Sequence, residues 1–334
     1  MSSIRLFAAS APCRRGRMTG AVSKGRRLIK ILFVVLLLVL LFGGGAKMIV
    51  AGGAKSLNMA DRLLGQGDGA RLLLADQPYG RGPRQLLDIW VPDSLREGDR
   101  LPVVVFFYGG GWNSGERGHY GFAGRALARQ GFVVVIPDYR LVPKAHWPDY
   151  LEDSAAAVAW THEHIAKLGG DPDRIALMGH SAGAYNAAML ALDPQWLHAA
   201  KSDPSIVRGV AGMAGPYDFL PLEKGGRAEK AMGKVRPIER TQPIRFARGD
   251  APPLWLATGD EDEVVRPRNS QNLAAAIERA GGSATLRIYA GVGHTGIVMA
   301  LAAPFQSRGP VLEEVSDFLR GVTARRIAPA DAPR

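Results

Sequence analysis

The sequence predicts an α/β protein in which helices cover both faces of one mostly parallel sheet. Two observations indicate this class. From residue 81 to residue 322, apolar runs of strand length alternate with helix-forming stretches. Strands that are hydrophobic along their whole length are typical of parallel sheets, because helices bury both faces of such a sheet. In addition, the sequence Gly-x-Ser-x-Gly stands at 179–183, directly between one apolar run and one helix-forming stretch.

At 334 residues, the chain is long enough for one large α/β domain or two small ones. Its net charge of +11 is concentrated in residues 1–47, which carry nine basic residues and no acidic ones, so the rest of the chain carries only +2. The basic residues therefore belong to a tail and not to a binding face, which excludes nucleic acid as a partner. The only cysteine, Cys13, lies in this tail, so the folded part forms no internal disulfide.

A long apolar segment, residues 31–50, follows a basic tail of residues 1–30. A stretch of about 20 apolar residues is long enough to cross the hydrocarbon core of a bilayer. The positive charges before it should stay in the cytoplasm, which places the remaining chain on the outer, periplasmic or extracellular side. Two interpretations are open: an uncleaved signal anchor, or a signal peptide cleaved near Ala46 or Ala54 that releases a secreted protein. Arg26 and Arg27 also weakly resemble a twin-arginine export signal.

The elements follow one another in a regular order. Residues 51–80 are interpreted as an amphipathic linker, and residues 81–322 as the domain. The predicted strands are the apolar runs 85–91, 101–107, 132–137, 175–178, 207–213, 253–258 and 285–289. The predicted helices are the helix-forming stretches between them, at 121–130, 150–168, 182–192, 269–280 and 311–321. Residues 323–334, rich in Ala, Pro and Arg, are expected to form a loose tail.

Ser181 is the candidate nucleophile. A sharp strand-to-helix turn holds the central serine of Gly-x-Ser-x-Gly in a strained backbone conformation and lifts its hydroxyl clear of both elements. Gly179 and Gly183 bracket the turn because only small residues leave room for it. A chance match in a Gly-rich chain is the alternative, which the flanking strand and helix disfavour.

A serine hydroxyl needs a base to take its proton and a third group to hold that base. His294 is the candidate base, because it lies in a Gly-rich loop directly after the last predicted strand, at the edge where α/β sheets build their sites. His180 lies inside the turn itself, and its side chain is expected to point away from the Ser181 hydroxyl. The remaining histidines have no motif around them: His119, His146, His162, His164 and His198.

An acidic loop, residues 260–263, follows the predicted strand 253–258. The next predicted strand, 285–289, is the one that precedes His294. The loop's Gly-x-x-Asp-x-x-Val spacing selects Asp262 as the acid that orients the base, with Asp260 as the alternative. The order Ser181, Asp262, His294 along the chain is the order expected for this class of fold.

The sequence Tyr-Gly-Gly-Gly-Trp at 108–112 follows another predicted strand. Glycines there let backbone N–H groups approach a substrate with no Cβ in the way, so Gly110 and Gly111 are candidate donors to an oxyanion. The N–H of Ala182, the residue after the nucleophile, is the candidate second donor.

Taken together, these motifs resemble the α/β-hydrolase fold carboxylesterases of the hormone-sensitive-lipase-like and bacterial feruloyl-esterase-like kinds, and also kynurenine formamidase. The matching segments are 108–112, 137–143, 169–172, 179–183, 259–265 and 293–294. The chain departs from the family at Tyr108, where the family has a histidine that shapes the loop. Asp138 and Arg140 match a family stretch that supports the fold, and we interpret them as a structural pair.

The predicted function is therefore hydrolysis of short-chain carboxylic esters by a serine carboxylesterase, through an acyl-enzyme intermediate. No metal or organic cofactor is expected, because no His/Cys cluster has zinc spacing and the Gly-rich loops fit neither a dinucleotide nor a P-loop fingerprint. Residues 215–251 contain no long apolar helix of the kind that forms a lipase lid. We therefore expect a modest, open acyl pocket lined by Trp112, Tyr217 and Phe219.

Two other functions stay open at this point. An aryl formamidase or amidase would use the same three residues, because both reactions share the acylation machinery. An ester is preferred, since an amine is a worse leaving group than an alkoxide and no second acid stands beside His294. A membrane-tethered binding module without activity is the alternative from another class.

Overall fold

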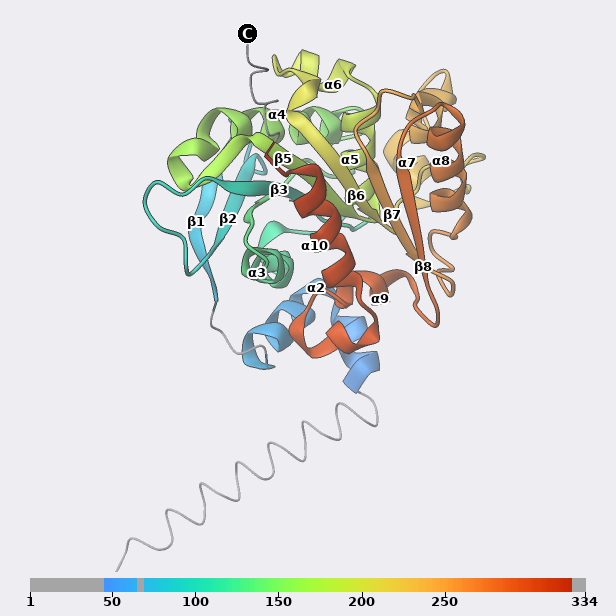
Figure 1. Ribbon diagram of the computed structural model, residues 1–334. Coiled ribbons are helices and arrows are strands. Elements are labelled where there is room, and N and C mark those ends of the chain that lie inside the picture. The colour runs from blue at the N-terminus through green and yellow to red at the C-terminus, as the bar shows by residue number, and fades with distance from the viewer. Residues whose placement is uncertain (1–44, 65–68, 326–334) are drawn as a thin grey trace, which may run out of the picture. The chain divides into compact units, whose positions relative to one another are not determined.

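The computed structural model of the chain describes residues 45–64 and 69–325 (Figure 1). The predicted basic tail, residues 31–44 of the apolar segment and residues 326–334 of the predicted C-terminal tail lie outside the described residues. The chain divides into two units, Met1–Ala51 and Gly52–Arg334. The sheet and the candidate site belong to the second unit, and they are described within it.

The second unit is built on a mostly parallel sheet, as the sequence predicts. Within the described residues the sheet has eight strands, in the order β1-β2-β4-β3-β5-β6-β7-β8. β1 pairs with β2, and β2 with β4, in antiparallel fashion, and every other pair is parallel. The strands are β1 (Ala70–Pro78), β2 (Leu86–Pro92), β3 (Leu101–Phe107), β4 (Val133–Pro137), β5 (Gly170–His180), β6 (Val207–Met213), β7 (Leu254–Gly259) and β8 (Ala284–Tyr289).

Helices cover both faces of this sheet. Those described in this unit after β1 are α3 (Gly121–Arg129), α4 (Asp149–His164), α5 (Ala182–Leu192), α6 (Gln195–Ala199), α7 (Arg227–Met232), α8 (Arg268–Arg279), α9 (His294–Met299) and α10 (Val311–Val322). α3 and α10 contact each other over one face, and α4 and α5 contact each other over the opposite face (Figure 1). The central strands are consequently buried on both sides, which explains why β3 and β4 are apolar along almost their whole length.

Most elements lie where the sequence predicts them. β3, β6 and α5 have the predicted bounds, and β5 begins five residues before its predicted start, at Gly170 instead of Ile175. β1 was not predicted, because it is an edge strand whose side chains after Ala70 are exposed or half-buried. Its pairing with β2 is also irregular between Leu72 and Gln77, so no clean alternation marks it in the sequence.

The interpretation of residues 51–80 as a linker is wrong. Helix α2 (Gly45–Leu64) is broken at Gly53, and β1 follows it. After the break, Leu57 is buried, and Asp61 is only 1% exposed. Both Oδ atoms of Asp61 are used: Oδ2 accepts from the Arg125 guanidinium at 2.6 and 2.8 Å, and Oδ1 accepts from the backbone of Ala303 at 2.9 Å. The second half of α2 is therefore part of the folded unit.

Among the residues that the structure describes, none of the helices combines the length and the apolar character that a membrane crossing requires. Most of the predicted membrane segment, residues 31–44, lies outside that part of the chain, so this segment stays a prediction from the sequence.

Replacing Asp61 with alanine should lower the free energy of unfolding by about 3–5 kcal/mol, because it leaves the buried Arg125 guanidinium without its counter-charge. The matched control is Asp250→Ala, which removes a 2.8 Å ion pair to Arg248 from a side chain that is 83% exposed. That change should lower the free energy of unfolding far less, because solvent screens an exposed ion pair. Urea denaturation of the purified variants measures both, and equal losses would contradict a buried, structural Asp61.

Candidate active site

Ser181 lies at the sharp turn between β5 and α5. Its backbone has φ 54° and ψ −122°, a strained conformation for a residue with a Cβ, and its N–H donates to Met213 in the neighbouring strand at 2.8 Å. The flanking glycines are a steric requirement. A Cβ on Gly179 would lie 2.4 Å from the backbone of Gly183, and a Cβ on Gly183 would lie 2.1 Å from the carbonyl oxygen of Phe107. The turn therefore presents the serine at the carboxyl end of the sheet.

His294 is the first residue of α9, which follows β8 after a short loop. Its Nε2 lies 2.9 Å from Ser181 Oγ, and its Nδ1 lies 2.8 Å from Asp262 Oδ2. An ionised carboxylate only accepts hydrogen bonds, so Nδ1 carries the proton and Nε2 is left to accept from the serine hydroxyl. The imidazole is thus oriented to remove a proton from Ser181.

Asp262 holds this orientation from the turn after β7. Its side chain is fully buried, and Oδ1 accepts from the backbone N–H groups of Val264 and Val265 at 3.0 and 2.8 Å. Oδ2 is left for His294. Asp260, the alternative, is exposed and accepts from the backbone of Gly291 at 2.7 Å instead. The structure thus brings Ser181, His294 and Asp262 together and places Asp260 in a supporting turn.

The glycine loop after β3 lies beside the serine. A Cβ on Gly109 would be 3.1 Å from the Cβ of Ser181. Gly110 and Gly111 have φ of 140° and 60°, which only glycine adopts without strain. Within the described part of the chain, the N–H groups of Gly110, Gly111 and Ala182 donate to no acceptor. All three are therefore free to bind a negatively charged oxygen.

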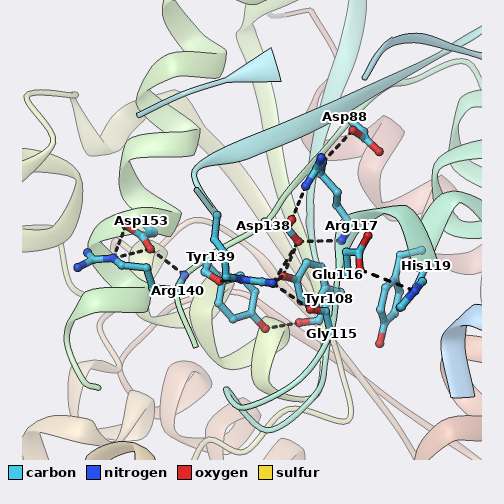
Figure 2. A network of polar contacts seen from close by, with 12 residues as sticks. Asp88, Tyr108, Gly115, Glu116, Arg117, His119, Asp138, Tyr139, Arg140 and Asp153 are labelled. Atoms are coloured by element: carbon cyan, nitrogen blue, oxygen red, sulfur yellow. Dashed lines mark hydrogen bonds and ion pairs between the residues drawn. The ribbon is translucent and has the colours of Figure 1, made fainter. Parts of the chain in front are cut away.

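A buried polar network holds this loop from behind (Figure 2). Tyr108, which replaces the family histidine, is stacked between Tyr120 and Tyr139, with ring centroids 5.3 and 4.8 Å away. Its hydroxyl donates to Asp138 Oδ1 at 2.7 Å and accepts from Arg84 at 2.7 Å. Burial and nearby charges raise the pKa of Tyr108 well above its usual value, so the hydroxyl keeps its proton. Tyr108 is therefore an internal support of the loop.

Asp138 and Arg140 are not a pair, which corrects the interpretation from the sequence. Asp138 is buried and accepts from Tyr108, Arg84 and both the backbone and the guanidinium of Arg117. Arg140 instead binds the buried Asp153 at 2.8 Å, on the far side of Tyr139 (Figure 2). Their side chains therefore enter separate clusters, Asp138 with Tyr108 and Arg140 with Asp153.

The three aromatic residues predicted to line the acyl pocket lie in different environments. Tyr217 is fully buried, and a Cβ on Gly212 in β6 would lie 2.0 Å from its hydroxyl, so it belongs to the core and not to a pocket wall. Trp112 is only 3% exposed and donates through Nε1 to Asn186 at 3.2 Å. Phe219 is half-buried, 6.1 Å from the ring of Tyr185. Only Phe219 keeps an appreciable exposed surface.

His180 is a second imidazole next to the site, buried beside His294 with the ring centroids 4.9 Å apart. Its Nε2 lies 2.9 Å from the backbone carbonyl of His294, so it donates there and holds the loop that carries His294. The sequence predicts that the His180 side chain points away from the Ser181 hydroxyl, and this contact agrees with that prediction. Burial, together with the neighbouring His294, lowers the pKa of His180 to about 3.

This depressed pKa should make the protein less stable in acid. Between pH 6.5 and 3 the unfolded chain binds a proton at His180 that the folded chain does not, so the free energy of unfolding falls as the pH is lowered. Replacing His180 with glutamine should reduce this slope by up to about 1.4 kcal/mol per pH unit. Urea denaturation at several pH values between 7.5 and 4.5 tests it. The same slope in both proteins would mean that His180 is protonated in the fold.

Sequence reasoning did not identify the contacts that Tyr120 and Tyr139 make with the glycine loop. Their hydroxyls donate to the loop carbonyls of Gly109 and Tyr108 at 3.3 and 2.7 Å. Tyr139 lies in the matching segment 137–143, but that resemblance does not indicate a contact with the glycine loop, and Tyr120 lies in no matching segment. Within the described ranges, no three His, Cys, Asp or Glu side chains are grouped so that they could hold a metal ion.

With this geometry in place, comparisons with known proteins identify related sequences. The BD-FAE family model matches residues 87–277. The esterase LipQ of Mycobacterium tuberculosis is 34% identical over 270 residues, which are 76% of this chain and 63% of that protein. The chain spans 50 to 63% of the length of the first curated relatives that it matches.

Solved structures share the fold. A truncated carbohydrate esterase from gut microbiota has a TM-score of 0.68 and 21% identity, over 78% of this chain and 99% of that one. Thermogutta terrifontis esterase 2, phosphonylated by sarin, has a TM-score of 0.64 and 23% identity, over 77% of this chain and 97% of that one. At these identities the likeness shows the fold alone.

Proposed function

Because this chain belongs to the BD-FAE family, we propose that it is a serine carboxylesterase that hydrolyses short-chain esters through an acyl-enzyme intermediate. The observation that carries this proposal is the continuous chain of hydrogen bonds from Ser181 through His294 to Asp262. It meets the geometric requirement for an activated nucleophile, a base and a group that orients the base. Free N–H groups beside the serine meet the further requirement for an oxyanion hole.

The proposed acylation step begins when Ser181 Oγ attacks the ester carbonyl and its proton moves to His294 Nε2. The carbonyl oxygen becomes an oxyanion that accepts from the N–H groups of Gly110, Gly111 and Ala182. Asp262 stabilises the imidazolium that forms. When the tetrahedral intermediate collapses, the C–O bond to the alcohol breaks and His294 returns the proton to the leaving alkoxide. The acyl group stays on Ser181.

Deacylation uses the same groups with water as the nucleophile. His294 Nε2 takes a proton from water as its oxygen attacks the acyl carbonyl, and the same three N–H groups bind the second oxyanion. Collapse of this intermediate breaks the bond to Ser181 Oγ, which recovers the proton from His294. The carboxylic acid leaves and the free enzyme is restored.

The segment between β6 and β7 supports small acyl groups. Its described helices are short: α7 and the 3-10 turns Ile238–Thr241 and Pro243–Phe246. A long apolar helix able to cover a fatty acyl chain is not found in this segment. The serious alternative is an activated amide such as an aryl formamide, which needs the same three residues and a better leaving group than an ordinary amine.

A panel of p-nitrophenyl esters from acetyl to decanoyl, measured beside N-formylkynurenine and a feruloyl ester, tests this proposal. We expect the highest kcat/KM on acetyl to hexanoyl esters. A clear preference for N-formylkynurenine would replace the esterase proposal by a formamidase. A folded wild-type protein that hydrolyses none of these substrates and does not label with a fluorophosphonate would favour the binding module without activity.

On sequence grounds we also propose that residues 31–50 insert in a membrane and that the catalytic unit lies on its outer side. Protease added to the outside of intact cells or spheroplasts should then degrade the catalytic unit. N-terminal sequencing of the mature protein separates an anchor from a cleaved signal. Protection of the full-length chain inside intact spheroplasts would overturn this proposal.

A further inference from the structure

The two candidate oxyanion donors in the glycine loop belong to peptide groups whose carbonyls are tethered. The Tyr120 hydroxyl donates to the carbonyl of Gly109 at 3.3 Å. The Ser114 hydroxyl donates to the carbonyl of Gly110 at 2.9 Å, and the N–H of Asn113 reaches the same oxygen at 3.3 Å. Each tether therefore acts on one peptide plane of the loop.

These peptide planes carry the donors. In a trans peptide group, the C=O of one residue and the N–H of the next are rigidly fixed and point in opposite directions. Both bonds are trans, since the cis bonds of the described residues all precede prolines. A hydrogen bond that fixes the Gly109 carbonyl therefore also fixes the direction of the Gly110 N–H. The bonds to the Gly110 carbonyl do the same for the Gly111 N–H.

We propose that Tyr120 is a positioning residue for the reaction, which aims the Gly110 N–H at the oxyanion by holding the Gly109 carbonyl, and that Ser114 does the same for Gly111. This inference rests on the proposed esterase function. Glycines at positive φ have no Cβ to restrict them, so the loop needs such external contacts to keep its donors in one orientation.

Tyr120 is suited to this role. It ends the 3-10 turn Arg117–Tyr120, is buried, and stacks on Tyr108, which the polar network of Figure 2 holds in place. Burial raises the pKa of Tyr120 to about 12, so the hydroxyl keeps its proton and donates throughout the working range of an esterase. Its ring also lies 6.0 and 5.7 Å from those of Phe106 and Phe122. The hydroxyl is therefore carried by a rigid aromatic cluster.

Tyr139 provides a matched comparison within the same loop. Its hydroxyl donates to the carbonyl of Tyr108 at 2.7 Å, a shorter bond than that of Tyr120, and its side chain is fully buried. That carbonyl shares its peptide plane with the N–H of Gly109, which is not a candidate donor. Loss of the Tyr139 hydroxyl should thus affect stability more and catalysis less than loss of the Tyr120 hydroxyl.

The test compares Tyr120→Phe and Tyr139→Phe in the full chain, with p-nitrophenyl butyrate as the substrate. Loss of a whole oxyanion donor lowers kcat by about 100- to 1,000-fold, so a donor that is kept but loosened should cost about tenfold. We expect this fall in kcat for Tyr120→Phe, with KM within about twofold, because the donor acts on the transition state. Tyr139→Phe should keep kcat within about threefold and show the larger drop in the urea midpoint.

An aryl trifluoromethyl ketone adds a readout that stability alone would not move. Ser181 adds to its carbonyl, and the resulting oxyanion occupies the hole. The inhibition constant should therefore rise about tenfold in Tyr120→Phe, in step with the fall in kcat/KM. Ser114 is exposed, so its replacement by alanine does not threaten folding. Ser114→Ala should raise the inhibition constant about threefold, because the hydrogen bond from Asn113 to the Gly110 carbonyl remains.

Unchanged kcat and inhibition constants in both Tyr120→Phe and Ser114→Ala would overturn the inference. Equal losses of kcat in Tyr120→Phe and Tyr139→Phe would also overturn it, because they would indicate a general loosening of the loop. In either case an active wild-type protein leaves the esterase proposal intact, whereas an inactive wild-type protein would refute the esterase proposal itself.

Discussion

Replacing Ser181 with alanine should lower kcat on p-nitrophenyl butyrate by about 10,000-fold or more and leave the fold intact. The side chain is half-buried, and alanine keeps the Cβ that the backbone already accommodates. His294→Ala should lower kcat to a similar level, because a serine without its base is a poor nucleophile. Steady-state kinetics give the rates, and circular dichroism checks the fold.

The double variant provides a sharper check than either single change. If Ser181 and His294 act as one unit, removing both should cost little more than removing one, so the two losses should not multiply. Ser205→Ala, at an exposed serine outside the site, is the control and should react with a fluorophosphonate as the wild type does. Labelling that persists in Ser181→Ala would show that a different residue is the nucleophile.

Replacing Asp262 with asparagine should lower kcat by about 1,000- to 10,000-fold through the tautomer of His294. The two backbone N–H groups of Val264 and Val265 require an acceptor, so the amide oxygen should take the place of Oδ1. The amide nitrogen then faces His294 Nδ1 and donates to it. Nε2 must carry the imidazole proton in that arrangement and can no longer accept one from Ser181.

Asp260→Asn is the matched control, two residues away in the same loop. Its oxygen can still accept from Gly291, so kcat should fall by no more than a few-fold. The pH profile of kcat/KM adds a second measurement. Its acidic limb reports the protonation of the catalytic base, and Asp262→Asn should change this limb. Equal effects of the two variants, or a larger effect of Asp260→Asn, would assign the orienting role to Asp260.

The resemblance to α/β-hydrolase carboxylesterases, read from short segments of the sequence, is confirmed by the family match and the shared fold. The sequence could indicate it because each segment is a local requirement. A strand of apolar residues, a turn that only glycine permits and a helix after it are set by neighbours in the chain. For this reason β3, β6 and α5 have their predicted bounds.

The roles of Ser181, Asp262 and His294 in the reaction stay a prediction, but their placement is now known. The sequence singled them out by their positions after strands, and parallel strands bring such positions to one edge. It could not separate Asp262 from Asp260 by geometry. That distinction depends on which carboxylate the fold turns toward His294: Asp262 contacts the imidazole, whereas Asp260 accepts from the backbone of Gly291.

What only the tertiary structure decided is how residues distant in the sequence support one another. Asp138 and Arg140 read as a pair because they are close in the chain, yet the fold gives them different partners, Tyr108 and Asp153. Tyr217 read as a pocket residue because it lies in a loop, yet its ring fills a space that glycines leave in the core. The tethers of Tyr120 and Ser114 act on backbone carbonyls, which every residue carries, so a sequence contains no sign of them.

The sequence by itself determined the fold class and the candidate chemical groups, because those depend on local pattern and residue type. The directions of these groups depend on packing across the sheet, which only the folded chain specifies.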